Sequence, residues 1–382
     1  MAARFQQYLL WLFILLNVFE SVKLIVTFIN GKSYSSLSNN MTRPVLQGTA
    51  YTMQETPDIY YIVFDGYTNK AALQEHWQYD NEIYSFLSNQ GFFTADSAFS
   101  NYNFTPYSIS SVFNLQYLVG AEPYLERNAA NFYTGLLSYR ENHLFNFLKK
   151  QGYKLSIFSL LNDTRYVTAL GNFAPEKPVT WLRKQTLERI YLNPWIMHKL
   201  RQLWGKKSEL PAAVLKSLQF YAQYNMKAMD HVVAGCQNLK VHVSASPVFS
   251  YTHFMLPHGP YVFDENGQVS LTVKDPGNDM QDYLVQLKYA NKLIRQITQC
   301  LLTDSTRKKI IVIQGDHGYR SYPNESQYLE YEALNAFYFY NKKYTGLKKD
   351  LSHVNTFRVV ANNFFNAGLP LLKDSIVLMK KN

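Results

Sequence analysis

Short apolar runs alternate with longer amphipathic stretches along most of the chain. The apolar runs predict strands at residues 59–64, 155–160, 248–251, 310–313 and 336–340. Apolar positions at helical spacing predict helices near residues 80–90, 141–151, 212–235, 278–302 and 354–366. Such alternation is typical of an α/β fold, so we expect a mostly parallel central sheet sandwiched by helices.

A longer apolar stretch, residues 8–30, has the length of a helix that crosses a bilayer. Asn17, Glu20 and Lys23 interrupt it. A charge at mid-membrane costs on the order of 3 kcal/mol, so these side chains must pair, face protein or reach the interface. A cleaved signal peptide and an amphipathic or buried soluble helix are the alternatives, although no small-x-small cleavage motif clearly follows the stretch. We expect an N-terminal membrane helix.

The polar residues that follow this stretch set the expected domain boundaries. Residues 31–56 contain many Ser, Thr and Asn side chains and show no periodicity, which is typical of a linker. We therefore expect a membrane anchor at residues 1–30, a linker at 31–56 and one catalytic domain at 57–382.

Composition and charge limit the classes of partner. Of the 382 residues, 47% are hydrophobic and 17% charged, which excludes a disordered, collagenous or coiled-coil chain. The net charge of +10 favours an anionic partner such as phospholipid head groups or a phosphorylated substrate. No nucleic acid is expected, because the basic residues are scattered and match no nucleic-acid-binding motif. The two cysteines, Cys236 and Cys300, cannot organise a disulfide scaffold or a zinc site, and the sequence leaves open whether they pair.

Acidic and histidine side chains follow two of the predicted strands directly. The first strand runs into Asp65, and the fourth runs into Asp316 and His317, which two glycines flank. Ligands of parallel α/β sheets bind at the carboxyl ends of the strands. A carboxylate there is desolvated on one side and suits a metal ion, although Asp65 could equally cap the next helix. The flanking glycines would let the backbone turn Asp316 and His317 toward one point.

Two further segments offer polar chemistry at element ends. Thr105 precedes Pro106, a pair that predicts a helix N-cap followed by a first-turn proline. Anions bind at such helix starts, and a hydroxyl there can become a nucleophile if a metal ion lowers its pKa; a plain helix cap is the alternative. After the third strand come His253 and His258, the latter between two prolines. We expect His258 to meet a ligand, and His253 either to join it or to support it by a hydrogen bond.

In order along the chain, these motifs resemble the alkaline phosphatase and sulfatase superfamily over residues 57–372. The most similar members are bacterial membrane-anchored proteins of the phosphoethanolamine transferase and lipoteichoic acid synthase type. The resemblance implies one divalent metal ion, manganese or zinc, with calcium and magnesium as alternatives. It implies the following ligands for that ion: Asp65, Thr105, Asp316 and His317. Thr105 would also be the nucleophile, His258 would contact the substrate phosphate, and His253 and Ser108 would support these residues.

The chain also departs from the pattern of this superfamily. Arylsulfatases carry Cys or Ser followed by x-Pro-x-Arg, and no such segment occurs here. The phosphoethanolamine transferases usually have Glu at the position of Asp65, and disulfides brace their nucleophile loop. A further histidine for a second metal ion is missing until His353.

The resemblance implies a membrane-anchored phosphotransferase or phosphodiesterase whose catalytic domain lies outside the cytoplasm. Its substrate would be a phosphorylated lipid or glycan of the cell envelope, and its other partner the membrane. A sulfatase-type ester hydrolase is one alternative, and a catalytically silent member that assists surface polysaccharide assembly is the other. No motif indicates an oligomeric state or tells a transferase from a hydrolase.

Overall fold

The computed structural model describes residue 46 and residues 56–118, 124–127, 129–161, 212–241, 246–272, 278–304, 306–320 and 328–380. All of these residues belong to one unit, Val45–Asn382. The expected membrane helix at 1–30 and nearly all of the expected linker lie outside the described residues. Within the described residues, no helix is both long and apolar enough to cross a membrane.

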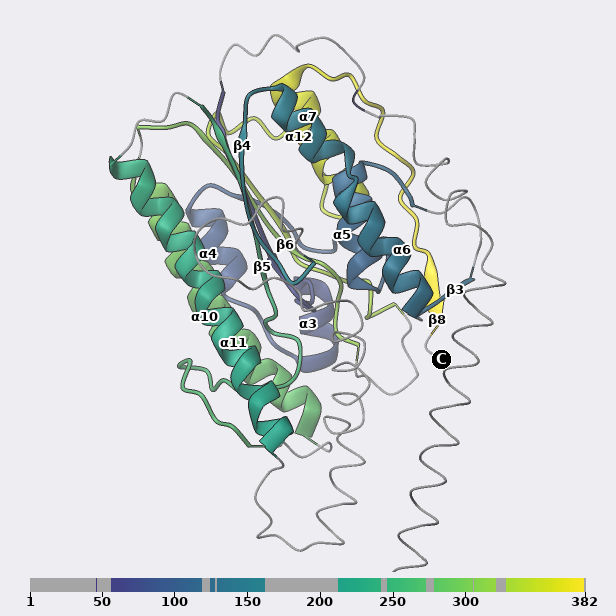
Figure 1. Ribbon diagram of the computed structural model, residues 1–382, viewed down its shortest axis with the longest axis vertical. Helices are drawn as coiled ribbons and strands as arrows, with labels where there is room; N and C mark the ends of the chain where they lie inside the picture. Colours follow the sequence, from purple (N-terminus) through teal and green to yellow (C-terminus); the bar gives the residue numbers. More distant parts are fainter. Residues whose placement is uncertain are drawn as a thin grey trace, which may run out of the picture. The chain divides into compact units, whose positions relative to one another are not determined.

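The described residues contain one large mixed sheet with the strand order β2-β7-β6-β1-β5-β4 (Figure 1). The parallel part comprises β1 (Asp58–Phe64), β4 (Lys154–Phe158), β5 (Val248–Phe254) and β6 (Lys309–Gly315). At one edge, β7 (Asn335–Phe339) runs antiparallel to β6, and β2 (Phe93–Ala95) runs antiparallel to β7. The predicted α/β class is therefore confirmed.

Helices cover both faces of this sheet (Figure 1). One face carries α3 (Lys70–Trp77), α4 (Ile83–Asn89), α10 (Ala212–Val241) and α11 (Asp279–Thr303). The other carries α5 (Thr105–Asn114), α6 (Ala129–Arg140), α7 (His143–Lys150), the 3-10 turn His353–Asn355 and α12 (Thr356–Phe365). A small parallel pair, β3 (Tyr124–Glu126) and β8 (Leu378–Lys380), lies apart from the main sheet.

The sequence of β1 explains its central place in the sheet. All seven of its residues are buried. Tyr60 and Ile62 pack into the core beneath α10 and α11, whereas Tyr61 and Val63 pack into the core beneath α5 and α12. A strand that is buried on both faces must be apolar at successive positions, which is why it appears as a continuous apolar run in the sequence.

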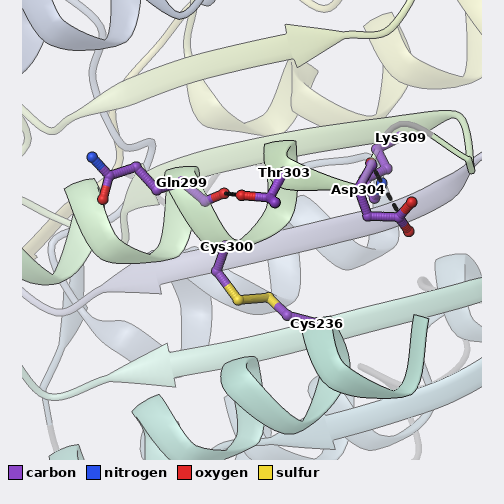
Figure 2. Close-up of a disulfide and its surroundings, with 6 residues drawn as sticks. All are labelled: Cys236, Gln299, Cys300, Thr303, Asp304 and Lys309. Carbon is purple, nitrogen blue, oxygen red and sulfur yellow. Dashed lines mark hydrogen bonds and ion pairs between the residues drawn. A yellow bond between two sulfur atoms is a disulfide. The ribbon is translucent and has the colours of Figure 1, made fainter. Parts of the chain in front are cut away.

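The question about the two cysteines is answered by a disulfide bond between Cys236 and Cys300 (Figure 2). Cys236 belongs to α10 and Cys300 to α11, and these helices lie side by side on one face of the sheet. The bond links residues 64 positions apart in the sequence. It therefore covalently joins the two long helices that pack on this face of the sheet.

Candidate functional site

The register of the sheet places the predicted polar residues together at the carboxyl ends of its central parallel strands. Phe64 of β1 lies opposite Gly315 of β6, so that the next residues, Asp65 and Asp316, leave their strands side by side. Phe64 also lies opposite Phe254 of β5, which places His253 one position earlier on the other neighbouring strand. Three adjacent parallel strands thus present the predicted residues together.

The side chains of these residues converge. His317 Nε2 lies 3.1 Å from Asp65 Oδ1 and 3.6 Å from Asp316 Oδ2. One ligand atom each from Asp65, His253 and Asp316 lie within 4.8 Å of one another, and the same holds for Asp65, His258 and His317. Both sets share Asp65, which is therefore central to the cluster.

Backbone contacts fix the orientation of Asp316 and His317. Asp316 Oδ1 accepts hydrogen bonds from the backbone N–H of Gly66 at 2.9 Å and of His317 at 3.0 Å, which leaves Oδ2 for the cluster. His317 Nδ1 lies 2.6 Å from the Gly318 carbonyl oxygen. A carbonyl can only accept, so Nδ1 carries the proton and Nε2 presents a lone pair toward both carboxylates.

Four buried polar atoms at the carboxyl ends of these strands have no hydrogen-bond partner among the described residues. They are the following: Asp65 Oδ1, His253 Nε2, Asp316 Oδ2 and His317 Nε2. Buried polar atoms are nearly always satisfied, and acceptors that face one another repel unless a proton or a cation lies between them. Two carboxylate oxygens with imidazole nitrogens are a donor set that divalent metal ions use. The residues therefore fit a metal ion.

The electrostatic surroundings favour the protonation states that metal binding needs. Burial by itself would raise the pKa of Asp65, but His258, His317 and Arg320 hold that pKa below its usual range. Burial lowers the pKa of His253, against the opposing effect of Asp316 and Asp65. Burial likewise lowers the pKa of His258. Ionised carboxylates and neutral imidazoles are the protonation states that metal ligation requires.

The glycines around Asp316 and His317 act differently from the sequence-based expectation. Neither Gly315 nor Gly318 has a left-handed φ, so neither is needed to swing the backbone. A Cβ atom at Gly315 would lie 2.5 Å from the Tyr67 carbonyl oxygen, and one at Gly318 would lie 2.1 Å from that of Leu329. These glycines are required because neighbouring backbone packs directly against them.

Thr105 begins α5 beside the cluster but is not its N-cap, which corrects the sequence-based prediction. The cap is Phe104, whose backbone is extended and whose carbonyl oxygen accepts from the N–H of Ser108 at 2.9 Å. Thr105 is the first helical residue and Pro106 follows it. The Thr105 side chain is partly exposed in the first turn of the helix.

Hydrogen bonds tie the start of α5 to the cluster on one side. The buried Ser108 hydroxyl donates to the Asp316 carbonyl oxygen at 2.5 Å and lies 2.9 Å from Ser100 Oγ. Residues three apart in a helix share a face, so Thr105 lies one turn above this contact. Ser108 thus holds α5 against the end of β6, which Asp316 follows.

His258 lies in a loop that both long helices hold. Its backbone N–H donates to the Asp65 carbonyl oxygen at 3.0 Å. Its own carbonyl oxygen accepts from the Tyr221 hydroxyl of α10 and from Gln286 Nε2 of α11, the latter at 3.0 Å. The loop is therefore positioned by the helices that the disulfide joins.

Sequence reasoning missed the residues that brace the segment before α5. Val377 N–H donates to the Asn101 carbonyl oxygen at 2.9 Å, and Asn101 Nδ2 donates to the Ser375 carbonyl oxygen at 2.7 Å. The C-terminal residues thus hold the approach to α5 by hydrogen bonds. No sequence signal marked these pairs, because they join residues more than 270 positions apart. Arg320 was also missed, although its position three residues after His317 was a usable signal.

Comparison with known proteins places this site in a family. The Sulfatase family model matches residues 57–363. No curated protein sequence matches the chain.

Among solved structures, the C-terminal periplasmic domain of EcEptC from Escherichia coli, in complex with zinc, is similar with a TM-score of 0.50. It is 11% identical, and the match covers 86% of this chain and 92% of that one. The Bacteroides fragilis protein yidJ, which has been assigned as a sulfatase, has a TM-score of 0.50 and 12% identity, over 88% of this chain and 81% of that one. The periplasmic domain of phosphoethanolamine transferase EptC from Campylobacter jejuni is 14% identical, with a TM-score of 0.46, over 84% of this chain and 96% of that one.

At such identities, EcEptC and yidJ support the fold alone. The family model, in contrast, spans well over half of the chain and includes both strand ends that carry Asp65 and Asp316. The chain therefore belongs to the Sulfatase family, within the alkaline phosphatase and sulfatase superfamily.

Proposed function

We propose that this protein is a metal-dependent phosphoester transferase or hydrolase that acts on a cell-envelope glycan or lipid through Thr105. The observation that carries the proposal is the set of unpartnered buried polar atoms on Asp65, His253, Asp316 and His317, at strand ends to which Ser108 of α5 is hydrogen-bonded. Buried polar atoms nearly always have partners, and a cation bound beside a nucleophile would supply them here.

The proposed ligands are Asp65, Asp316, His317 and the Thr105 hydroxyl, with His253 as a further candidate because its Nε2 is unpartnered. When bound, a divalent ion would lower the pKa of the Thr105 hydroxyl and offset negative charge on the phosphoryl group. Manganese and zinc suit the mixture of oxygen and nitrogen donors, and zinc is the first to test because EcEptC was solved with it.

The chain's own residues would then carry the reaction. Thr105 Oγ forms a bond to phosphorus, its proton passes to water, and the leaving oxygen departs and takes up a proton. The positive end of the α5 dipole would face the non-bridging oxygens and stabilise their charge. A hydroxyl of water or of a sugar or lipid then attacks phosphorus and restores the threonine, which gives hydrolysis or transfer respectively.

The Cys236–Cys300 bond supports an extracytoplasmic site of action. Disulfides persist in oxidising compartments and are rare in the cytosol. An enzyme that is anchored through residues 1–30 would hold this domain near the membrane surface, where envelope lipids and glycans lie. The anchor itself remains a prediction.

Sulfate-ester hydrolysis is the second candidate, because the family takes its name from it. Thr105-Pro106 replaces the Cys/Ser-x-Pro-x-Arg segment, which favours phosphate over sulfate.

The test compares bis(4-nitrophenyl) phosphate with 4-nitrophenyl sulfate as substrates. We expect phosphodiester turnover that Thr105→Ala abolishes and that Thr303→Ala, an exposed threonine on α11, leaves unchanged. Arylsulfate turnover without phosphodiester turnover would favour the sulfatase. Metal binding without either activity would favour the silent member.

A further inference from the structure

Arg320 lies between the His258 loop and the start of α5. Its guanidinium donates to His258 Nε2 at 2.7 Å and to the Asn103 carbonyl oxygen at 3.2 Å. Asn103 precedes Thr105 by two residues. The guanidinium therefore touches both the segment that leads to Thr105 and the loop of His258, the residue that the sequence resemblance assigns to the substrate phosphate.

The hydrogen bonds of His258 define its tautomer. Nδ1 lies 2.6 Å from the Gly259 carbonyl oxygen, and because a carbonyl only accepts, Nδ1 carries the proton. Arginine only donates, so Nε2 accepts from Arg320. Both ring nitrogens are thus engaged, and the neutral ring presents no N–H to a phosphate. The same two bonds keep His258 from ligating a metal ion.

Exposure places Arg320 on the open side of the cluster. Asp316 and His317 are buried, whereas Asp65, His258 and Arg320 are partly exposed, like Thr105. Arg320 and Thr105 are therefore both accessible to solvent, whereas Asp316 and His317 are not.

A second cation lies close to Arg320. Arg127 forms an ion pair with Glu330, and Asn103 Nδ2 donates to the same carboxylate at 2.6 Å. Burial, followed by the proximity of Arg320, lowers the pKa of Arg127. Arg320 and Arg127 are thus two cations near one another beside the start of α5, and a substrate anion there would reduce their mutual repulsion.

We infer that Arg320 is the residue that binds the phosphate oxygens of the substrate, and that His258 positions Arg320 instead of donating to phosphate itself. This inference rests on the proposed function, because it names the phosphate ligand of the same site. A planar guanidinium suits two oxygens of one phosphate, and its charge persists at any working pH. His258, Arg320 and the start of α5 then form one connected binding surface.

A double-mutant cycle tests this assignment on the full-length, metal-loaded enzyme. Turnover of bis(4-nitrophenyl) phosphate and inhibition by inorganic phosphate are measured for Arg320→Gln, His258→Ala and the double variant, together with metal content. Arg320→Gln should lower kcat/KM by roughly 10²-fold, weaken phosphate inhibition and leave metal content unchanged. Because His258 acts through Arg320, the double variant should be about as impaired as Arg320→Gln alone.

Conservative variants separate positioning from simple loss of structure. Arg320→Lys keeps the charge but loses the planar fork, so it should recover only part of the activity. His258→Gln keeps an acceptor for Arg320 and should be more active than His258→Ala. Arg295→Gln removes a surface arginine that faces Glu82 and should change neither rate nor phosphate inhibition.

Additive losses in the cycle would overturn the inference, because they would show that His258 contacts the phosphate independently. Unchanged phosphate inhibition in Arg320→Gln would also overturn it. If the wild type turns over no phosphodiester, calorimetry with inorganic phosphate tests phosphate binding by Arg320 separately from the proposed activity. Binding that Arg320→Gln abolishes would uphold the phosphate site while the proposed function fails, and no binding to the wild type would refute both.

Discussion

Replacing Asp316 by Asn should stabilise the metal-free protein while it removes the response to metal. In the wild type, Asp316 Oδ1 already accepts from two backbone N–H groups, whereas Oδ2 is buried without a partner. Asn can keep the first oxygen and place an N–H₂ donor at the second position, which lies 3.6 Å from His317 Nε2 and near the Asp65 carboxylate. An acceptor among acceptors is thus replaced by a donor.

The magnitude follows from the cost of an unsatisfied buried group. That cost is about 1–3 kcal/mol, so metal-free Asp316→Asn should unfold with a free energy higher by roughly this amount. The wild type should gain about 4 kcal/mol when the metal concentration is 1,000 times its dissociation constant, and the variant should gain much less. The order of stability therefore reverses when metal is added.

Denaturant unfolding at pH 8 measures the free energy of unfolding of each protein, first with chelator and then with zinc or manganese. Asp58→Asn is the matched control. Asp58 is also buried and is the first residue of β1, but its carboxylate pairs with Arg307, whose Nε lies 2.6 Å from Asp58 Oδ2. Breaking that pair should cost about 3 kcal/mol and leave the metal response intact. If Asp316→Asn were destabilised like the control and kept the full metal response, Asp316 would not be a ligand.

Three further predictions concern the rest of the molecule. Reducing the Cys236–Cys300 bond should lower the free energy of unfolding by about 4 kcal/mol, because the loop that it closes is long; denaturant curves that do not shift with reductant would contradict this. Burial lowers the pKa of His231 from 6.5 to about 4, so the unfolded chain takes up a proton that the folded chain does not. Stability from this group should fall by up to about 3 kcal/mol as the pH drops from 6.5 to 4, and His231→Gln should flatten that slope; an unchanged slope would count against it. Deleting the residues after Asp374 should lower kcat more than metal content, because it frees Asn101 from its C-terminal partners, and an unchanged kcat in a folded deletion variant would refute the bracing role.

The core of the fold could be predicted because its strands are buried on both faces. β1 and β6 appear as uninterrupted apolar runs, and the predicted helix at 278–302 matches α11 closely. β5 extends beyond the predicted strand to Phe254, because Thr252 and His253 are polar yet buried. Short elements such as β2, β3 and β8 have too few residues for periodicity to show.

Helix α6 shows why local propensity can mislead. Gly135 lies within it, and glycine lowers helix propensity, which weakens the pattern in the sequence. In the structure, a Cβ atom at Gly135 would lie 2.6 Å from Pro106 Cβ. The glycine is needed because α6 packs closely against the start of α5, beside Thr105.

The candidate site was predictable to the extent that strand ends determine it. Asp65, Asp316 and His317 follow strands that proved to be neighbours, so their convergence follows from the register. The N-cap at Thr105 was placed one residue late, because the extended backbone of Phe104 supplies the cap through its carbonyl oxygen. Arg320 stands only three residues after His317, which was a usable signal, but its contacts with Asn103 and His258 join distant loops that local sequence does not encode.

The central claim is that Thr105 becomes covalently attached to phosphorus, and mass spectrometry of the acid-quenched enzyme tests it most directly. The metal-loaded wild type is incubated with a phospholipid, digested and compared with Thr105→Ala. The proposed function predicts a metal-dependent phospho-adduct on the peptide that contains Thr105, with none in the variant. Phosphoester turnover without an adduct, or with the adduct on Ser108 in both proteins, would contradict it.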